Sequence, residues 1–307
     1  MKIISNIVFT RNRPLQLEAY LQSLYRYFPA EFIQTYILQK VELFDKQYEQ
    51  VFGKYASCVV IKENDFFSDF LRLLGQVSTE YILFGVDDVV YFDSVDIDLV
   101  EECFAGFGRD IFGFSLRLGP ERIKAGGDVV NQLVVGGQTV YSIDWMRGRT
   151  PAARYPFELC ATIYPTALVK RIIESVPNGN PVVRKLFSPA SGLIGLLGGI
   201  ISTRRILKSF GYFFSPNTLE SWNCRWCQNH SDRLPAFLYF QKQCAAAIQV
   251  NMVNTSTYNT WDDCAEYTVE TLAEKYKQGY RLDIDFVSAC KPAQTHCGRE
   301  SFRLVKT

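Results

Sequence analysis

The stretch EYILFGVDDVVYF, residues Glu80–Phe92, decides the fold. A run of apolar residues, Tyr81–Val86, ends in two adjacent carboxylates, Asp87 and Asp88, and apolar residues follow directly. Two like charges side by side repel each other, and each resists removal from water. A buried strand that ends in two acids therefore needs a positively charged partner at that point.

The chain before this stretch alternates predicted strands with predicted helices. Single helices between strands indicate parallel crossovers, and hence an α/β fold with a doubly wound, mostly parallel sheet flanked by helices. Ligands of such sheets bind outside the carboxyl ends of the strands. The segments Thr10–Arg13 and Asp87–Asp88 both follow strand ends, so we expect them to meet at one edge. The expected strands are Lys2–Phe9, Gln34–Gln39, Ala56–Lys62 and Glu80–Val86, and the expected helices are Pro14–Phe28, Asp45–Tyr55 and Asp65–Ser78.

The rest of the chain is less regular. Gly pairs around apolar runs predict a hairpin within Gly126–Trp145. A helix is expected from about Pro165, and a second one after Ser215, with Asn217 as its N-cap residue. Further expected elements are a strand over 110–119, a strand over 245–254 and a helix that ends near Gly279.

Composition limits the class of protein. The 307 residues are 48% hydrophobic and 21% charged with a net charge of +1, which is typical of a soluble globular protein and gives no reason to expect a nucleic-acid partner. The odd number of cysteines, 9, favours free thiols in a reducing compartment. For Cys224 and Cys227 we expect buried thiols and not a zinc site, because no second pair lies at zinc-like spacing. The start of the chain lacks signal-peptide features, and no apolar run reaches the roughly 20 residues of a membrane span, so we expect a cytoplasmic protein.

Two carboxylates at a strand end coexist at neutral pH when a divalent cation lies between them and a phosphate group. Mg²⁺ and Mn²⁺ take oxygen ligands from one or two carboxylates and complete their shell with substrate phosphates. The alternative interpretation of Asp87 and Asp88 is one helix-capping acid beside a solvated one. Their position after the fourth strand, between two apolar runs, favours the metal.

Four stretches together resemble glycosyltransferases of the GT-A fold. These are IVFTRNRPLQLEAYLQSL near the start, YILFGVDDVVYF at the place of the DxD-type motif, PFELCATIY where an acceptor-side carboxylate is expected, and FSLRLG between the last two. The chain departs from the family pattern in having DDV in place of a strict DxD. The resemblance implies one domain over residues 1–307, with a nucleotide-sugar-binding half over 1–118 and an acceptor-binding half over 119–307.

The resemblance also implies roles for single residues. Asp88 binds the metal that bridges the donor diphosphate, and Asp87 lies near the ribose or the metal. His296, late in the chain, completes the metal shell, although a lone histidine is more often only hydrogen-bonded. The residues implied to line the nucleotide base and ribose are Thr10, Arg11, Asn12 and Arg13. The alternative for the two arginines is that they are solvated loop charges.

A transferase that inverts the anomeric centre needs a base that takes the proton of the acceptor hydroxyl. Glu158, a charge within an apolar stretch, is the first candidate, and Asp144 in YSIDWM is the second. The alternative role for Glu158 is a structural ion pair with Arg154 or Arg149. For Glu220 in PNTLE, the sequence indicates a role at the acceptor site only weakly.

An apolar, Gly-studded insert lies around residues 182–214. Its centre, Gly192–Ile201, has basic residues on both sides, a pattern that suits contact with an anionic bilayer or a lipid-linked acceptor. Burial in the core is the other interpretation. If the membrane contact holds, the protein is peripheral at the inner face of the membrane.

We therefore expect a metal-dependent glycosyltransferase that acts on a hydroxyl of a glycan or lipid-linked glycan in cell-surface polysaccharide biosynthesis. A UDP-sugar is the first choice of donor. Two alternatives stay open: a nucleotidyltransferase acting on sugar phosphates, and a non-catalytic module that binds nucleotides or sugars. The lack of glycine in FTRNRPLQ counts against the nucleotidyltransferase, since such enzymes use a Gly-rich phosphate loop.

Overall fold

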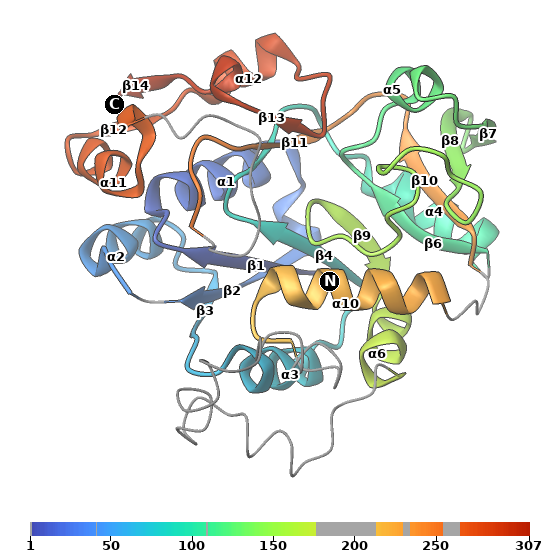
Figure 1. Cartoon of the computed structure of the whole chain (residues 1–307), viewed down its shortest axis with the longest axis horizontal. Helices are drawn as coiled ribbons and strands as arrows, with labels where there is room; N and C mark the ends of the chain where they lie inside the picture. The colour runs from blue at the N-terminus through green and yellow to red at the C-terminus, as the bar shows by residue number, and fades with distance from the viewer. Residues whose placement is uncertain (1, 41, 109, 176–212, 230–233, 254–264) are drawn as a thin grey trace, which may run out of the picture.

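The computed structural model describes residues 2–40, 42–108, 110–175, 213–229, 234–253 and 265–307. Within them a nine-stranded sheet with the order β3-β2-β1-β4-β9-β6-β10-β8-β7 forms the centre of the molecule (Figure 1). Its strands are β1 (Ile4–Arg11), β2 (Ile33–Lys40), β3 (Val59–Lys62), β4 (Tyr81–Val86), β6 (Ile111–Ser115), β7 (Val130–Val135), β8 (Gln138–Asp144), β9 (Thr162–Pro165) and β10 (Ala236–Phe240).

Most strands of this sheet point the same way. The pairs β1–β2, β2–β3, β1–β4 and β6–β10 are parallel, whereas β9 runs antiparallel between β4 and β6, and β8 runs antiparallel between β10 and β7. The α/β class with a mostly parallel sheet is thus confirmed. The antiparallel insertion of β9 was not expected, because its four residues are too few to show a period.

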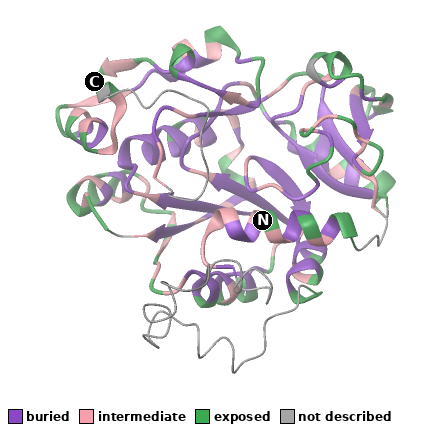
Figure 2. Ribbon diagram, viewed as in Figure 1, coloured by how far each residue is buried: buried purple, intermediate pink, exposed green. Residues whose placement is uncertain are grey.

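Helices cover both faces of the sheet, and the core is correspondingly split into two layers. One layer packs β1 and β4 against α1, α2, α4, α11 and α12, and the other packs the opposite face against α3, α6 and α10. Figure 2 shows buried residues along the inner strands of the sheet, whereas the edge strands β3 and β7 consist mainly of intermediate and exposed residues. The helices are α1 (Pro14–Tyr27), α2 (Asp45–Lys54), α3 (Phe66–Gln76), α4 (Ile97–Phe107), α5 (Pro120–Ala125), α6 (Thr166–Ser175), α10 (Pro216–Asn229), α11 (Val269–Lys277) and α12 (Ile284–Cys290).

A three-stranded sheet ties the late part of the chain to the end of β4. Strand β5 (Val89–Tyr91) pairs with β11 (Ala245–Ile248), and β11 pairs with β13 (His296–Cys297). The backbone N–H of Ile248 also donates to the carbonyl oxygen of Asp88, at 2.7 Å. Residues near position 296 are therefore carried to the edge of the sheet where the acid pair lies. Near the C-terminus, β12 (Tyr280–Leu282) and β14 (Leu304–Lys306) form a separate antiparallel pair.

The expected local structure is largely confirmed. The hairpin β7–β8 turns at Gly136 and Gly137, whose positive φ angles of 55° and 78° suit a two-residue hairpin loop. The expected cap of α10 is wrong: Ser215 and not Asn217 precedes the helix, and the Ser215 hydroxyl accepts from the Thr218 N–H at 3.4 Å.

The insert over 182–214 lies almost wholly outside the described residues. Its described end is part of the core, since Phe213 is fully buried and its ring centroid lies 4.5 Å from that of Phe67 on α3. Among the helices that the structure describes, none is both long and apolar enough to cross a membrane.

Candidate active site

One edge of the central sheet collects the residues that carry chemistry. Asp87 and Asp88 follow β4, and the Thr10–Arg13 segment begins at the end of the parallel neighbour β1. Glu158 joins them because β9 is antiparallel: Thr162 pairs with Phe84 of β4, so the residues before β9 lie beyond the carboxyl end of β4.

Arg13 is the partner that lets the two acids lie side by side. Its Nη1 atom lies 3.0 Å from Oδ1 of Asp87 and 3.3 Å from Oδ2 of Asp88, and its Nη2 atom donates to the backbone oxygen of Asn251. All three charged side chains are buried, with relative exposures of 7%, 4% and 8%. Burial alone lowers the pKa of Arg13, but the two carboxylates outweigh it and the pKa is raised. Arg13 is therefore not a solvated loop charge.

Both carboxylate oxygens of Asp87 accept hydrogen bonds. Oδ1 takes the ion pair with Arg13, and Oδ2 accepts from the Thr10 hydroxyl at 2.9 Å and from the Arg11 backbone N–H at 3.2 Å. The Tyr48 hydroxyl supports this arrangement, because it lies 2.9 Å from the Thr10 hydroxyl and accepts from the Arg13 backbone N–H at 3.0 Å. Burial raises the pKa of Asp87, and Arg13 opposes the increase.

Asp88 keeps one oxygen available. Its Oδ1 atom is buried and has no hydrogen-bond partner among the described residues, although an unpaired buried acceptor is costly. With one arginine beside two carboxylates, the cluster also retains one negative charge. A free carboxylate oxygen with surplus charge fits a Mg²⁺ or Mn²⁺ that takes its other ligands from water and phosphate. We assign the metal to Asp88 alone, because within the described part of the chain no three His, Cys, Asp or Glu residues form a metal-binding group.

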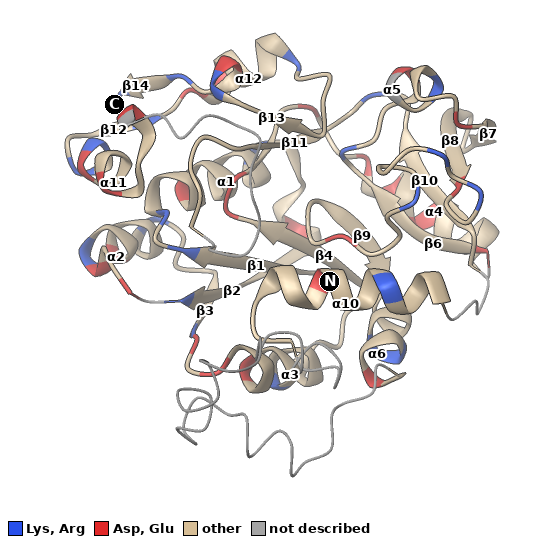
Figure 3. Cartoon of the chain, in the orientation of Figure 1, with Lys and Arg blue, Asp and Glu red and all other residues tan. Residues whose placement is uncertain are grey.

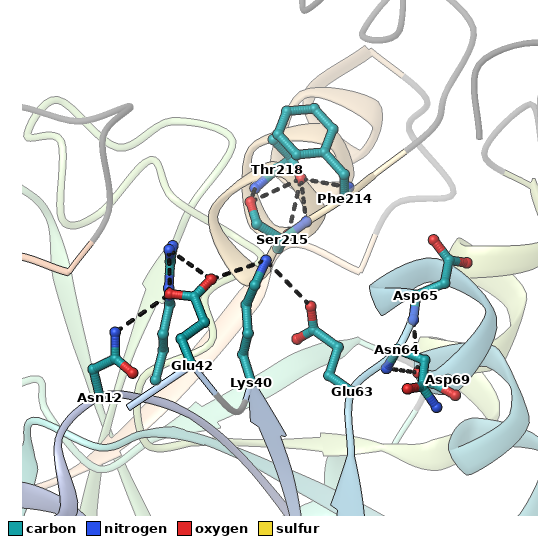
Figure 4. Close-up of polar contacts among 11 residues, drawn as sticks. Asn12, Lys40, Glu42, Glu63, Asn64, Asp65, Asp69, Phe214, Ser215 and Thr218 are labelled. Carbon is teal, nitrogen blue, oxygen red and sulfur yellow. Dashed lines mark hydrogen bonds and ion pairs between the residues drawn. The ribbon is translucent and has the colours of Figure 1, made fainter. Parts of the chain in front are cut away.

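Arg11 and Asn12 belong to a second, more exposed cluster. Figure 4 shows its members Asn12, Lys40, Glu42 and Glu63 near the ends of β1 to β3. Arg11 forms a two-pronged ion pair with Glu42, with closest atoms 2.7 Å apart, and Asn12 donates to the same carboxylate at 3.3 Å. Lys40 lies 3.9 Å from Glu42 and 3.8 Å from Glu63. Asn12 has a φ angle of 55°, a left-handed conformation that asparagine tolerates better than most residues.

Glu158 lies in a third cluster, around Arg117. Its Oε2 atom forms an ion pair with Nη2 of Arg117, and its Oε1 atom accepts from the Thr162 hydroxyl and, at 3.5 Å, from that of Ser115. The expected alternative partners Arg154 and Arg149 do not fill this role. Arg117 directly follows the β6 region and is 4% exposed, and the sequence analysis assigned it no role.

His296 contacts the Arg117 cluster. Its Nε2 atom lies 3.3 Å from Nη1 of Arg117, and its Nδ1 atom lies 3.2 Å from the Thr295 hydroxyl. The Thr295 carbonyl oxygen also accepts from Arg117, at 3.2 Å. The late strand β13 thus fixes the guanidinium that holds Glu158.

The Arg117 cluster and the acid pair are neighbours. Burial raises the pKa of the Cys160 thiol far above its ordinary value; Arg117 opposes the increase, while Glu220, Glu158 and Asp88 add to it. Carboxylates of both clusters therefore act electrostatically on the same half-buried thiol. Glu220, on α10, is the third acid that acts on this thiol.

Asp144 lies elsewhere. It ends β8, which runs antiparallel to β10, and it pairs with Ala236 at the start of β10. That position is the opposite edge of the sheet from Asp87 and Asp88. Its oxygens accept from the Met146 N–H at 2.9 Å and lie 3.5 Å from Arg147, so its environment is a local surface turn.

The CxxC pair is part of the core. Cys224 and Cys227 are each 3% exposed and pack on α10 among the apolar residues of the α3–α6–α10 layer. Burial raises the pKa of Cys224 to about 12, and it raises that of Cys227 as well. Both thiols are thus buried, as expected from the sequence.

Charge elsewhere is mixed. Figure 3 shows Lys and Arg beside Asp and Glu on the outer helices α2, α3 and α11, so none of these faces carries one sign alone.

No family model matches the chain, and no curated protein matches it. Solved structures do match. S. aureus TarS is 20% identical with a TM-score of 0.39 over 56% of this chain and 30% of that chain, and S. aureus TarS 1-349 in complex with UDP is 18% identical with a TM-score of 0.40 over 56% and 48%. The mannosyltransferase PcManGT from Pyrobaculum calidifontis, in complex with GDP-Man and Mn²⁺, is 11% identical with a TM-score of 0.30 over 39% and 36%.

These structures include a glycosyltransferase, the class that the sequence motifs resemble. The matched region spans 30% to 49% of the TarS chains and 36% of the mannosyltransferase. None of these TM-scores exceeds 0.40, so the function proposed for this chain rests on its own residues.

Proposed function

We propose that the chain is a glycosyltransferase that moves a sugar from a nucleotide-diphosphate donor to a hydroxyl group. One observation supports this proposal above all others: a buried, unpartnered carboxylate oxygen of Asp88 at the carboxyl edge of a mostly parallel sheet. Ligands of α/β sheets bind at this edge. Transfer of a sugar also needs acid–base groups near the donor, and the Glu158 cluster neighbours Asp88.

A divalent cation, Mn²⁺ or Mg²⁺, fits Asp88. Bound there, it would stabilise the negative charge that develops on the departing nucleoside diphosphate. The neighbouring residues of the chain would position the carboxylate that binds this cation. Arg13 and Asp87 fix Asp88 in a buried position, and the single surplus negative charge attracts a cation without the repulsion that two free carboxylates would cause.

The donor is proposed to be a UDP-sugar, bound by the segment Thr10–Arg13. In this proposal the base and ribose lie along the exposed cluster of Arg11, Asn12 and Glu42, and the diphosphate points toward Asp88. Figure 4 shows that the polar side chains after β1, β2 and β3 gather at this place. Polar groups there would replace the hydrogen bonds that a nucleoside loses on leaving water.

The acceptor is proposed to be a glycan or lipid-linked glycan of a cell-surface polysaccharide pathway, handled by a cytoplasmic protein that contacts the inner face of the membrane. This part rests on the resemblance of the sequence motifs. The insert expected to make the membrane contact lies outside the described residues.

The metal and donor site is tested by isothermal titration with UDP in the presence and absence of Mn²⁺. Asp88→Asn should abolish the Mn²⁺-dependent part of UDP binding, because the amide lacks the negative charge that the cation needs. Asp144→Asn is the matched control: the same change, on the opposite edge of the sheet, should leave binding unchanged. Equal UDP and Mn²⁺ affinity in Asp88→Asn and the wild type would overturn the site.

Product analysis separates the rival functions. A glycosyltransferase releases UDP from a UDP-sugar, with water as a slow acceptor when no other is present. A nucleotidyltransferase releases sugar phosphate or pyrophosphate instead, and a pure binding module releases nothing. Chromatography of incubations with UDP-Glc, UDP-GlcNAc and GDP-Man distinguishes the three outcomes.

A further inference from the structure

We propose that Arg13 is a built-in counter-ion that keeps the acid pair from binding a divalent cation alone, so that the cation binds together with the donor diphosphate. The inference rests on the proposed function and deepens it, because it concerns the order of binding at the same site. It is drawn from the contacts among Arg13, Asp87 and Asp88, which leave one carboxylate oxygen without a partner among the described residues.

The four carboxylate oxygens of the acid pair are not equally open to a cation. Oδ1 of Asp87 accepts from Nη1 of Arg13 at 3.0 Å. Oδ2 of Asp87 accepts from the Thr10 hydroxyl at 2.9 Å and from the Arg11 backbone N–H at 3.2 Å. Oδ2 of Asp88 lies 3.3 Å from the same Nη1 atom of Arg13, whereas Oδ1 of Asp88 is buried and has no partner among the described residues. A cation at this place would therefore take one ligand from the pair.

Arg13 is also held by groups other than the two acids. Its backbone N–H donates to the Tyr48 hydroxyl at 3.0 Å, and its Nη2 atom donates to the backbone oxygen of Asn251. The Asn251 side chain accepts from Gln16 at 3.3 Å and donates to the Tyr267 carbonyl oxygen at 2.8 Å, so this anchor is itself fixed. The guanidinium cannot turn away without losing these contacts. Its positive charge therefore stays beside the acid pair.

The charges of this cluster decide how strongly it attracts a free cation. Two carboxylates and one guanidinium leave a surplus of one negative charge, and no other ion pair among the described residues involves these three side chains. Arg13 repels a cation at Oδ1 of Asp88, because its guanidinium lies beside the other oxygen of the same carboxylate. Mg²⁺ gives up its water reluctantly, and Mn²⁺ takes the same kinds of ligand. One carboxylate beside a guanidinium is therefore a weak site for either free ion.

A diphosphate changes this balance. Its oxygens supply the negative charge and the ligands that the acid pair lacks, so the cation and the nucleotide favour each other's binding. By linkage, the nucleotide raises the affinity for the cation by the same factor as the cation raises the affinity for the nucleotide, and such factors are typically about 5- to 150-fold. Arg13 thus suits a site that takes up little free Mn²⁺ and binds the Mn²⁺ complex of the donor.

Four forms of the protein separate the charge of Arg13 from the number of carboxylates. Asp87→Asn leaves Asp88 offset by Arg13, with no surplus charge. Arg13→Gln leaves two carboxylates without a guanidinium. The double variant Arg13→Gln/Asp87→Asn keeps Asp88 alone and so has the same surplus as the wild type, one negative charge. Isothermal titration with MnCl₂ in the absence of nucleotide measures the cation affinity of each form.

The affinity for Mn²⁺ alone should follow the surplus charge. It should be lowest in Asp87→Asn, similar in the wild type and the double variant, and highest in Arg13→Gln, about tenfold or more above the wild type. A merely structural role of Arg13 predicts instead that Arg13→Gln binds Mn²⁺ no better than the wild type, and that Asp87→Asn equals the double variant. That result would overturn the inference.

Two further variants and measurements control this comparison. Arg72→Gln removes an arginine that also pairs with an aspartate, Asp69 at 2.7 Å, but on the exposed side of α3, so the Mn²⁺ affinity should not change. Circular dichroism verifies that Arg13→Gln is folded, because it leaves two buried acids without a counter-charge. If it does not fold, Asp87→Asn and the double variant still give the effect of Arg13, since these two differ only at residue 13.

The same titrations with UDP present distinguish the failure of this inference from the failure of the proposed function. UDP should raise the Mn²⁺ affinity of the wild type by about 5-fold or more, and Mn²⁺ should raise the UDP affinity by the same factor. If the wild type binds neither UDP nor GDP in the presence of Mn²⁺, the proposed function and this inference both fail. If UDP binds with Mn²⁺, but the wild type binds Mn²⁺ equally tightly without UDP, only the role of Arg13 fails.

Discussion

The same combination, two carboxylates and one arginine, occurs twice at the edge of the sheet. In the first cluster Arg13 contacts both acids, at 3.0 Å from Asp87 and 3.3 Å from Asp88. In the second, Arg117 forms an ion pair with Glu158 but not with Glu220. Both arginines are nearly fully buried.

The difference shows how geometry divides roles among identical groups. A guanidinium between two acids offsets part of the cost of burying both, and the Asp88 oxygen that it leaves without a partner among the described residues suits a metal ion. A guanidinium committed to one acid leaves the other without a counter-charge, and desolvation then favours its protonated form. Within one edge, the chain thus holds a carboxylate with a free oxygen that suits a cation and a carboxylate whose pKa is raised to about 8.

The largest expected effect comes from removing the shared guanidinium. Arg13→Met leaves Asp87 and Asp88 buried beside each other without a positive charge. Loss of one partner of a buried ion pair costs about 3–5 kcal/mol in the free energy of unfolding. Urea denaturation at neutral pH measures this loss.

Arg11→Met is the matched control for Arg13→Met. Arg11 is two residues away and also pairs with a carboxylate, but its side chain and that of Glu42 are each 36% exposed. Exposed ion pairs contribute roughly 0.2–1 kcal/mol. Similar losses in the two variants would contradict the view that Arg13 holds the acid pair together.

The second expected effect is a pH dependence of stability that belongs to Glu220. Its pKa rises from the ordinary 4.5 to about 8 on folding, so between these values the folded protein holds a proton that the unfolded chain has lost. The free energy of unfolding should therefore fall as the pH rises through this window, by at most roughly 1.4 kcal/mol per pH unit, and level off above it.

Glu220→Gln isolates this contribution, since glutamine does not titrate. The difference in unfolding free energy between the wild type and Glu220→Gln should change steadily across the window from 4.5 to about 8. Glu102→Gln, which removes an exposed acid on α4, serves as the comparison and should show much less change. A constant difference for Glu220→Gln would mean that Glu220 is ionised at neutral pH and that the two clusters are alike.

The parallel strands β1 to β4 could be predicted from the sequence, but β9 could not. Strands β1 to β4 have long apolar runs separated by amphipathic helices, which is a strong local signal. Strand β9 has four residues, and its direction depends on pairing with β4 and β6, which are far away in sequence. Since β9 brings Glu158 to the edge, the second cluster depended on the part of the topology that could not be predicted.

The candidate site was predictable where it followed a strand end. Asp87, Asp88 and the Thr10–Arg13 segment lie together as expected. The role of Arg13 as counter-ion was not expected, because a loop arginine is usually solvated. Arg117 carried only a weak signal, a lone charge in FSLRLG directly after an apolar run. The environment of Glu220 has no signature in the sequence, since it results from three segments that meet only in the folded chain.

The smallest expected effect concerns the helix that carries Glu220. Figure 4 shows Ser215 and Thr218 at the start of α10, where the Thr218 hydroxyl accepts from the Ser215 N–H at 3.0 Å and the Ser215 hydroxyl accepts from the Thr218 N–H. Ser215→Ala removes this N-cap and should cost about 1 kcal/mol in the free energy of unfolding.

Ser221→Ala is its control, because this exposed hydroxyl only donates to the Asn217 carbonyl oxygen within the same helix, at 2.7 Å, and its loss should be close to neutral. Loosening the first turn of α10 also admits water around Glu220, so desolvation weakens and the pKa of Glu220 should fall toward its ordinary value. Ser215→Ala should therefore weaken the pH dependence of stability that belongs to Glu220, whereas Ser221→Ala should leave that dependence unchanged. If Ser215→Ala loses stability without changing this pH dependence, the environment of Glu220 is set by the Arg117 cluster alone and not by the start of α10.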